Sequence, residues 1–274
     1  MNALSQAAYL LIIALKGEAV REHLELLSGD HQLIGELYRP QTQGPCPCLI
    51  LGHGLTGNRN ERLLVTISQT LYDIGISSLR FDFNGHGESS GAAQNVTLRS
   101  ETADLAAVLA FAKAHPGLDS AQLFVSGHSM GSLVALMTYA QQPQAIAGLV
   151  LISSAFTIFH ELTAPLTGSN LTSFLSKGVM DLGGFQIGRE LIEDCAALDG
   201  FALARQVTPH ALLIHGQNDQ DSPPYNSVQL KYIWKEHAQL KLIPGADHCY
   251  TNTDANLQVC QEISHYMERC IAAE

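Results

Sequence analysis

Short apolar runs that alternate with helical patterns constrain the fold of this chain more than any other feature of its sequence. Each run has the length and character of a strand buried on both faces of a parallel sheet. These runs are Cys48–Leu51, Ile76–Phe81, Leu123–Val125, Leu149–Ile152, Ala211–Ile214 and Leu240–Ile243. Upstream of them, Leu24–Leu27 and Leu33–Tyr38 flank Ser28-Gly29-Asp30, a pattern that predicts a β-hairpin.

Helical patterns lie between and after the predicted strands. Thr97–His115 carries apolar residues at helical spacing and is stopped by Pro116-Gly117, and Leu133–Tyr139 continues as helix until Pro143. The last segment predicts an amphipathic helix whose apolar stripe is Leu257, Cys260, Ile263, Met267 and Ile271. Strands that alternate with helices indicate βαβ units and therefore a layered α/β sheet.

One long stretch interrupts the alternation. From Ala155 to Arg205 no strand is evident, and some fifty residues are too many for an ordinary loop. We therefore predict a cap at 155–205, inserted over one edge of a core formed by 21–154 and 206–274. Two ordinary connecting helices are the alternative.

Composition narrows the class of protein. The chain has 274 residues, of which 46% are hydrophobic, so it can bury a sizeable core in one large domain or two small ones. Its net charge of −11 argues against a nucleic-acid binder, which needs basic surface. No apolar run is long enough for a membrane-spanning helix. The six cysteines are scattered, with no second pair to match Cys46 and Cys48, and are expected to be reduced thiols in a cytoplasmic protein.

The N-terminal extension, residues 1–20, has no assigned role. Its Ala7–Leu15 stretch is apolar, but no Lys or Arg precedes it and no clear cleavage site follows before Lys16. A helix that packs on the body or on a partner is favoured over a signal peptide.

The sharpest local motif is Gly127-His128-Ser129-Met130-Gly131. It follows a predicted strand and precedes a predicted helix, the context in which G-x-S-x-G presents a nucleophilic serine. Glycines on both sides allow strand and helix to approach closely, and Ser129 would stand beside a helix N-terminus. The alternative is a structural glycine-rich turn whose serine has no catalytic role.

A serine nucleophile needs a base and an acid that orients the base. Asp219 and His248 each follow a predicted strand, and both come after Ser129, which gives the chain order Ser, Asp, His. Asp221 is the alternative acid. Asp247 is expected to be a capping residue, and His215 a structural hydrogen-bonding residue.

Two backbone amides are candidates for stabilising a tetrahedral oxyanion. One is the N–H of Met130, directly after the serine, and the other is the N–H of Leu55 in the glycine-rich turn Gly52–Gly57. Three histidines stand in glycine-rich turns: His53, His86 and His128. They are expected to shape these turns, not to transfer protons.

The same glycine-rich turn offers a rival interpretation. Gly52, Gly54 and Gly57 spell G-x-G-x-x-G, and Asp82 follows another predicted strand, close to the fingerprint of a dinucleotide-binding oxidoreductase. Against it, Asn58–Arg62 is a bulky, charged start for a helix that must pack on a pyrophosphate. No H-E-x-x-H motif or G-K-[ST] loop occurs, and neither a metal nor any other cofactor is expected.

Four stretches carry a family resemblance: Gly52–Arg59, Arg80–Ser89, Gly127–Gly131 and Gly245–Tyr250. With them, the chain from about residue 24 onward resembles an α/β-hydrolase, and more narrowly the intracellular cinnamoyl and feruloyl esterases. The resemblance implies an eight-stranded, mostly parallel sheet flanked by helices, with a small inserted cap that holds an aromatic acyl group.

For individual residues, the resemblance implies the triad Ser129, Asp219 and His248, with Leu55 and Met130 as oxyanion donors. Met130 and Leu55 depart from the Gln and Phe often found at these positions in such esterases, which puts the pocket shape in question. The aromatic residues expected to bind substrate in the cap are Phe156, Phe159 and Phe185.

The expected function is therefore hydrolysis of small carboxylic esters through an acyl-enzyme, with hydroxycinnamate or short-chain acyl esters as substrates. A peptidase or amidase and a thioesterase of the same fold are alternatives. A hydrolase fold that only binds would be expected to lack a triad residue. The sequence leaves a homodimer open.

Overall fold

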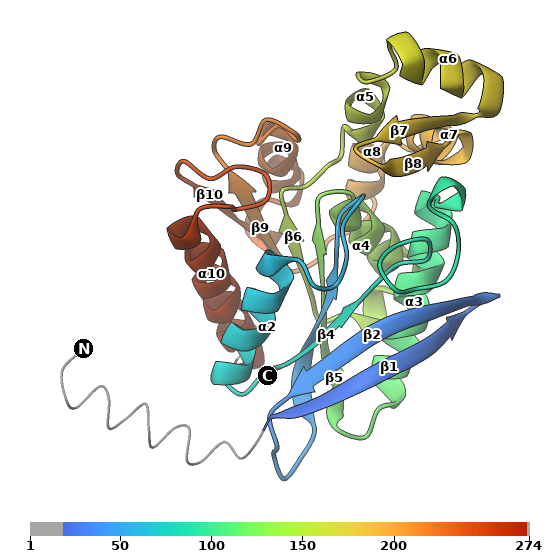
Figure 1. Ribbon diagram of the computed structural model, residues 1–274. Helices are drawn as coiled ribbons and strands as arrows, with labels where there is room; N and C mark the ends of the chain where they lie inside the picture. The colour runs from blue at the N-terminus through green and yellow to red at the C-terminus, as the bar shows by residue number, and fades with distance from the viewer. Residues whose placement is uncertain (1–18, 273–274) are drawn as a thin grey trace.

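The central feature of the structure is an eight-stranded sheet with the order β1-β2-β4-β3-β5-β6-β9-β10. The computed structural model describes residues 19–272 (Figure 1). The first pairings, β1 with β2 and β2 with β4, are antiparallel, and all others are parallel. The strands are β1 (Val20–Ser28), β2 (His31–Arg39), β3 (Cys46–Gly52), β4 (Ser77–Phe81), β5 (Leu118–His128), β6 (Gly148–Ile152), β9 (Ala211–Gly216) and β10 (Ala238–Ile243).

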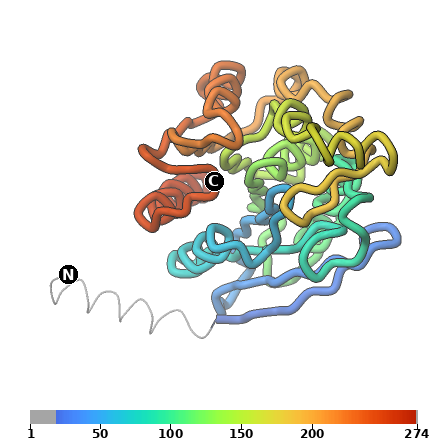
Figure 2. The backbone as a smooth tube through the Cα atoms, turned by 45° about the horizontal axis from the view of Figure 1, so that its top comes forward, coloured from blue at the N-terminus to red at the C-terminus, as the bar shows by residue number. Residues whose placement is uncertain are grey.

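Helices cover both faces of this sheet. On one face lie α2 (Arg62–Asp73) and α10 (Thr253–Ala272), which contact each other, and Figure 2 shows them on the side of the molecule away from the 155–205 segment. On the other face lie α3 (Leu98–Ala114), α4 (Met130–Gln141) and α9 (Tyr225–Trp234). Short 3₁₀ turns complete the main body: η1 (Ala93–Asn95), η2 (Pro143–Ala145) and η3 (Lys235–His237).

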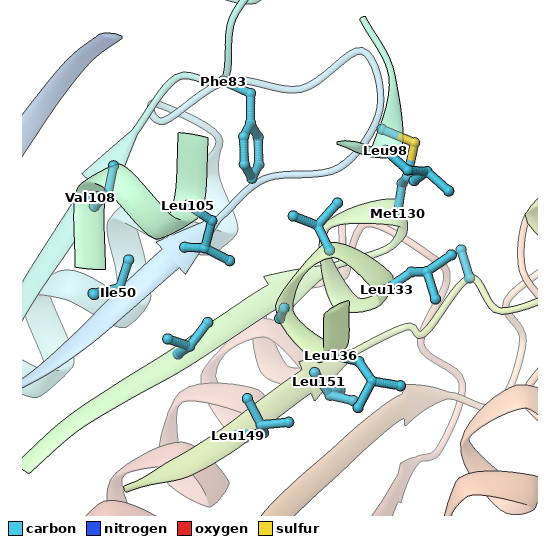
Figure 3. Packing of buried hydrophobic residues seen from close by; sticks show 14 of the residues in the cluster. Ile50, Phe83, Leu98, Leu105, Val108, Met130, Leu133, Leu136, Leu149 and Leu151 are labelled. Carbon is cyan, nitrogen blue, oxygen red and sulfur yellow. The ribbon is translucent and has the colours of Figure 1, made fainter. Parts of the chain in front are cut away.

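Burial of the central strands on both faces explains their continuous apolar sequence. In β3, Cys48 and Ile50 pack into the core beneath α3 and α4, whereas Leu49 and Leu51 pack into the core beneath α2 and α10. Figure 3 shows Ile50 within the first of these cores. The predicted α/β fold, its hairpin and its eight-stranded, mostly parallel sheet are confirmed.

The amphipathic stripe of the last helix was predicted with one error. Cys260, Ile263 and Met267 are buried as expected, but Leu257 is 46% exposed. The buried side of α10 instead begins at Ala255 and Asn256, so Leu257 falls off the packed face. The predicted Ala7–Leu15 helix lies outside the described residues. Within residues 19–272, no helix is long and apolar enough to cross a membrane.

The segment 155–205 contains a small sheet that the sequence did not suggest. Its elements are α5 (Ile158–Thr163), α6 (Gly168–Lys177), β7 (Val179–Leu182), β8 (Phe185–Gly188), α7 (Arg189–Ala197) and α8 (Gly200–Ala204). Strands β7 and β8 pair antiparallel across Gly183-Gly184, both of which have positive φ as a two-residue hairpin turn requires. The expectation of no strand in this segment was therefore wrong. These strands leave no clear signal in the sequence, because each has only four residues and its side chains are mostly not buried.

Asp82, the acid of the alternative dinucleotide-binding motif, is fully buried and already hydrogen-bonded within the protein. Its Oδ1 accepts a hydrogen bond from the Arg59 backbone N–H at 2.6 Å, and its Oδ2 accepts from the Arg59 guanidinium and, at 2.9 Å, from the Glu88 N–H. A carboxylate that is fully buried and paired in this way is not accessible to a ribose hydroxyl. The bond ties the loop after β3 to the end of β4.

We predict that Asp82→Asn destabilises the protein by about 3–5 kcal/mol, since it leaves the buried Arg59 guanidinium without its buried countercharge. Urea unfolding measures this loss. Glu88→Gln, which removes the exposed partner of the same guanidinium, is the matched control and is expected to cost much less. Equal losses in the two variants would contradict this account of the Arg59–Asp82 pair.

Candidate active site

The serine turn, residues 127–131, joins β5 to α4 with a strained backbone. Ser129 has φ 54° and ψ −123°, and its N–H donates to the Ile152 carbonyl at 2.9 Å. A Cβ atom at Gly127 would lie 2.0 Å from the Gly131 oxygen, and one at Gly131 would lie 2.4 Å from the His53 oxygen. Both glycines are therefore required for strand, turn and helix to meet so closely.

The two backbone amides predicted as oxyanion donors, those of Met130 and Leu55, belong to segments that meet at this serine. Met130 is the first residue of α4, where a backbone N–H has no acceptor within the helix. Leu55 lies in the turn closed by the Gly57 N–H donating to the Gly54 oxygen at 3.0 Å. A Cβ atom at Gly54 would be 3.0 Å from the Ser129 Cβ, so this turn and the serine turn are in contact.

The side chain of Met130 points away from the cavity. It is fully buried in the core near Leu98 (Figure 3). The substitution of Met for the Gln often found in resembling esterases therefore does not reshape the cavity, whereas Leu55 lines it directly.

Asp219 and His248 form a close hydrogen-bonded pair. His248 Nδ1–H donates to Asp219 Oδ2 at 2.7 Å, and the backbone amides of Asp221 and Ser222 donate to Asp219 Oδ1 at 3.0 and 2.8 Å. The parallel pairing of β9 with β10 places the two loops that carry these residues side by side. Asp221, the alternative acid, supplies its amide to Asp219 and does not hold His248.

His215 adds a second imidazole to the carboxylate. Its ring is fully buried, with Nδ1 2.8 Å from Ser227 Oγ and Nε2 3.0 Å from the Ser222 oxygen and 3.1 Å from Asp219 Oδ2. Because the last two groups only accept, Nε2 carries the proton. The expected structural role of His215 is confirmed, and its contact with Asp219 is an addition.

These contacts set the protonation of the pair. Burial raises the pKa of Asp219, but the hydrogen bonds from His215 and His248 outweigh burial and hold it below its ordinary value. For His248, burial lowers the pKa, while the hydrogen bond and charge of Asp219 raise it above 6.5 overall.

The three histidines expected to shape turns, His53, His86 and His128, do so. His53 Nδ1–H donates to the Gly54 oxygen at 2.8 Å while its Nε2 accepts from the Phe83 N–H at 3.1 Å. Burial lowers the pKa of His53 to about 3 and that of His128 to about 4, so both stay neutral. His128 Nε2–H donates to the His248 oxygen at 2.9 Å, and His86 Nδ1–H donates to the Asn84 oxygen at 3.0 Å.

Ser129 and His248 line one cavity of about 720 Å³. Residues of the turn before α2 and of the segment 155–205 close it from two sides. The apolar side chains that this segment contributes are aliphatic: Ile158, Leu162, Ala164, Pro165 and Leu182.

The three aromatic residues predicted to bind substrate do not line this cavity, and that expectation is corrected. Phe156 and Phe159 line a separate cavity of about 240 Å³, and Phe185 stacks on His86 with ring centroids 4.7 Å apart. Phe156 is buried beside Leu133 of α4, and Phe185 contacts His86, so these two aromatic side chains anchor the segment to the body of the protein.

Two carboxyl groups that the sequence did not single out also line the cavity, Glu61 just before α2 and Glu161 in α5. No motif surrounds either residue, and only the folded chain brings them to Ser129. Within residues 19–272, no three His, Cys, Asp or Glu side chains are grouped so as to hold a metal ion.

The sheet order, the serine turn at the end of β5 and the acid and histidine after later strands define an α/β-hydrolase. The family model described as serine aminopeptidase, S33, matches residues 43–184, just over half of the chain. The chain belongs to this family within the α/β-hydrolase superfamily.

Solved structures and sequence relatives agree with this class. Est1E from Butyrivibrio proteoclasticus, solved with ferulic acid bound, superposes with a TM-score of 0.81 at 26% identity, over 91% of this chain and 99% of that one. A mitochondrial palmitoyl-protein thioesterase of Rattus norvegicus is 25% identical over 80% of this chain and 74% of its own. The monoglyceride lipase of Homo sapiens is 32% identical over 47% of this chain and 41% of its own.

We predict that Gly131→Ala lowers the stability by about 1–3 kcal/mol, because the new methyl group would overlap the His53 backbone oxygen. Thermal unfolding measures the change. Gly44→Ala is the control, since nothing lies within 4 Å of a Cβ atom there. An unchanged melting temperature for Gly131→Ala would mean that the two turns are not in close contact.

Proposed function

We propose that the protein hydrolyses carboxylic esters through a covalent acyl-enzyme on Ser129. The observation that carries this proposal is the hydrogen-bonded His248–Asp219 pair lining the same cavity as a serine on a strained strand-to-helix turn. A base held by a buried acid is what a serine hydroxyl requires to become a nucleophile at neutral pH.

In the first half of the reaction, His248 Nε2 takes the proton of the Ser129 hydroxyl as its Oγ attacks the carbonyl carbon. The oxyanion accepts hydrogen bonds from the Leu55 and Met130 amides, each worth about 2.7–4 kcal/mol. The imidazolium then gives its proton to the leaving alcohol oxygen as the carbon–oxygen bond breaks.

In the second half, His248 takes a proton from a water molecule that attacks the acyl-enzyme carbonyl. The second tetrahedral intermediate collapses, the Ser129 oxygen recovers its proton from His248, and a carboxylic acid leaves. Asp219 holds the imidazole in the required tautomer throughout and stays ionised, in keeping with its lowered pKa. No cofactor takes part.

The cavity supports a small-molecule ester as substrate, because about 720 Å³ lies within the usual range for such sites. Within this class we propose hydroxycinnamate or short-chain acyl esters, supported by the likeness to Est1E with ferulic acid bound. A cytoplasmic location is part of the proposal, because no two cysteines of residues 19–272 form a disulfide. Two observations favour second candidates: the family description favours amide or peptide cleavage, and the thioesterase relative favours thioester cleavage.

Initial rates on an ester and amide panel test the proposal. The panel contains a short-chain nitrophenyl ester, a longer-chain one, a methyl hydroxycinnamate and an aminoacyl anilide. We expect ester hydrolysis by the wild type and a loss of about 10⁴-fold in kcat for Ser129→Ala. Cleavage of the anilide alone would replace the esterase with an amidase, and activity that survives in Ser129→Ala would remove Ser129 from the mechanism.

The pH dependence tests the acid and the base. His248 must be neutral to take a proton, and its pKa is raised, so kcat/KM is expected to fall with decreasing pH around a midpoint above 6.5. Asp219→Asn is expected to lower kcat by about 10⁴-fold. Asp221→Asn is the matched control, with a loss of at most about tenfold. If Asp221→Asn were the more damaging change, the assignment of the acid would be wrong.

A further inference from the structure

The candidate active site is lined by acidic side chains and by the imidazoles of His160 and His248. Glu61, Glu161 and Asp221 line the cavity, and no Lys or Arg is among its lining residues. A half-enclosed cleft lined by one sign of charge concentrates ligands of the opposite sign, because its low-dielectric walls focus the field.

Glu161 is the carboxyl group whose position is best defined. Its Oε1 accepts a hydrogen bond from Thr157 Oγ1 at 2.9 Å and lies 3.3 Å from Ser222 Oγ, whose one proton is shared with the Ser154 carbonyl oxygen at 3.0 Å. Within residues 19–272, its Oε2 has no hydrogen-bond partner, so one oxygen anchors the group and the other is left for a ligand.

The contact with Ser222 also defines on which side of the cavity Glu161 lies. Ser222, whose hydroxyl oxygen lies 3.3 Å from Glu161 Oε1, donates its backbone N–H to Asp219 Oδ1 at 2.8 Å. Glu161 therefore lies next to the loop that carries the acid of the pair with His248. In the proposed reaction His248 protonates the leaving alcohol, so groups on its side of the cavity face the alcohol part of the ester.

We infer that Glu161 is a specificity-determining residue that selects esters whose alcohol part carries an alkylammonium cation. This inference rests on the proposed ester hydrolysis at Ser129. A carboxylate already held in place by the Thr157 hydroxyl group attracts the cation without reorganisation, and it disfavours alcohols that carry phosphate or carboxylate groups.

The protonation of the cavity acids agrees with this assignment. Burial raises the pKa of Glu161, and it raises that of Glu61 to about 7, and the charge of His248 offsets this effect only in part. An alkylammonium group entering the cavity would supply the missing positive charge.

A pair of esters with nearly the same shape isolates this effect. Acetylcholine and 3,3-dimethylbutyl acetate differ mainly by one positive charge, at the quaternary centre of the alcohol part. We expect wild-type kcat/KM to favour acetylcholine by about 5–10-fold, the size of a partly screened charge pair. In Glu161→Gln this ratio is expected to fall to near 1.

Glu190→Gln is the matched control, because it removes one negative charge from an exposed position of α7 in the same segment. It should leave the ratio as in the wild type. Competitive inhibition of nitrophenyl acetate hydrolysis by tetramethylammonium is a second readout, and it should weaken in Glu161→Gln only. Thermal unfolding shows whether each variant is folded.

The outcomes separate this inference from the proposed function. A wild-type ratio of 1 or less, or a ratio that Glu161→Gln leaves unchanged, would overturn the role of Glu161. Hydrolysis of nitrophenyl acetate without hydrolysis of acetylcholine would overturn it as well while sparing the esterase. If no ester in the set is hydrolysed, the proposed function itself fails.

Discussion

The contact between the serine turn and the Leu55 turn is the constraint on which the candidate site depends. Gly131 sits directly against the His53 oxygen, and Gly54 sits against the Ser129 side chain. Neither turn could carry a larger residue at these points without moving the other. The same contact that packs β3 against α4 therefore also holds the turn of Leu55 against the serine turn.

In the segment 155–205, aromatic and aliphatic side chains have different roles. Aromatic residues attach it to the body, as Phe185 does on His86, while aliphatic residues such as Ile158 and Leu182 face the cavity. Glu161 links this segment to the loop of Asp219 through Ser222. We therefore expect a substitution in this segment to affect the loop of Asp219 as well as the cavity.

Much of this arrangement was predictable from the sequence, for a physical reason. Buried parallel strands need continuous apolar runs, and a nucleophilic turn needs glycines at fixed positions, so the strands and Ser129 leave strong local signals. The β7–β8 hairpin does not, because its strands have four residues each and are mostly not buried. The direction in which Phe156 or Phe159 faces depends on packing between segments distant in sequence, which periodicity does not encode.

Asp82 shows how a motif can fit two folds. Its spacing from Gly52-His53-Gly54 suits a dinucleotide site, but the charged residue Arg59, which argued against that interpretation, is the partner that occupies the carboxylate. Glu61 and Glu161 are the opposite case, since they reach the cavity without any motif.

Intact-mass analysis after treatment with a fluorophosphonate tests the central claim, a nucleophilic serine activated by His248 and Asp219. The account predicts one covalent adduct on the wild type, located at Ser129, and none on Ser129→Ala. An unmodified wild-type protein, or an adduct that persists in Ser129→Ala, would contradict it.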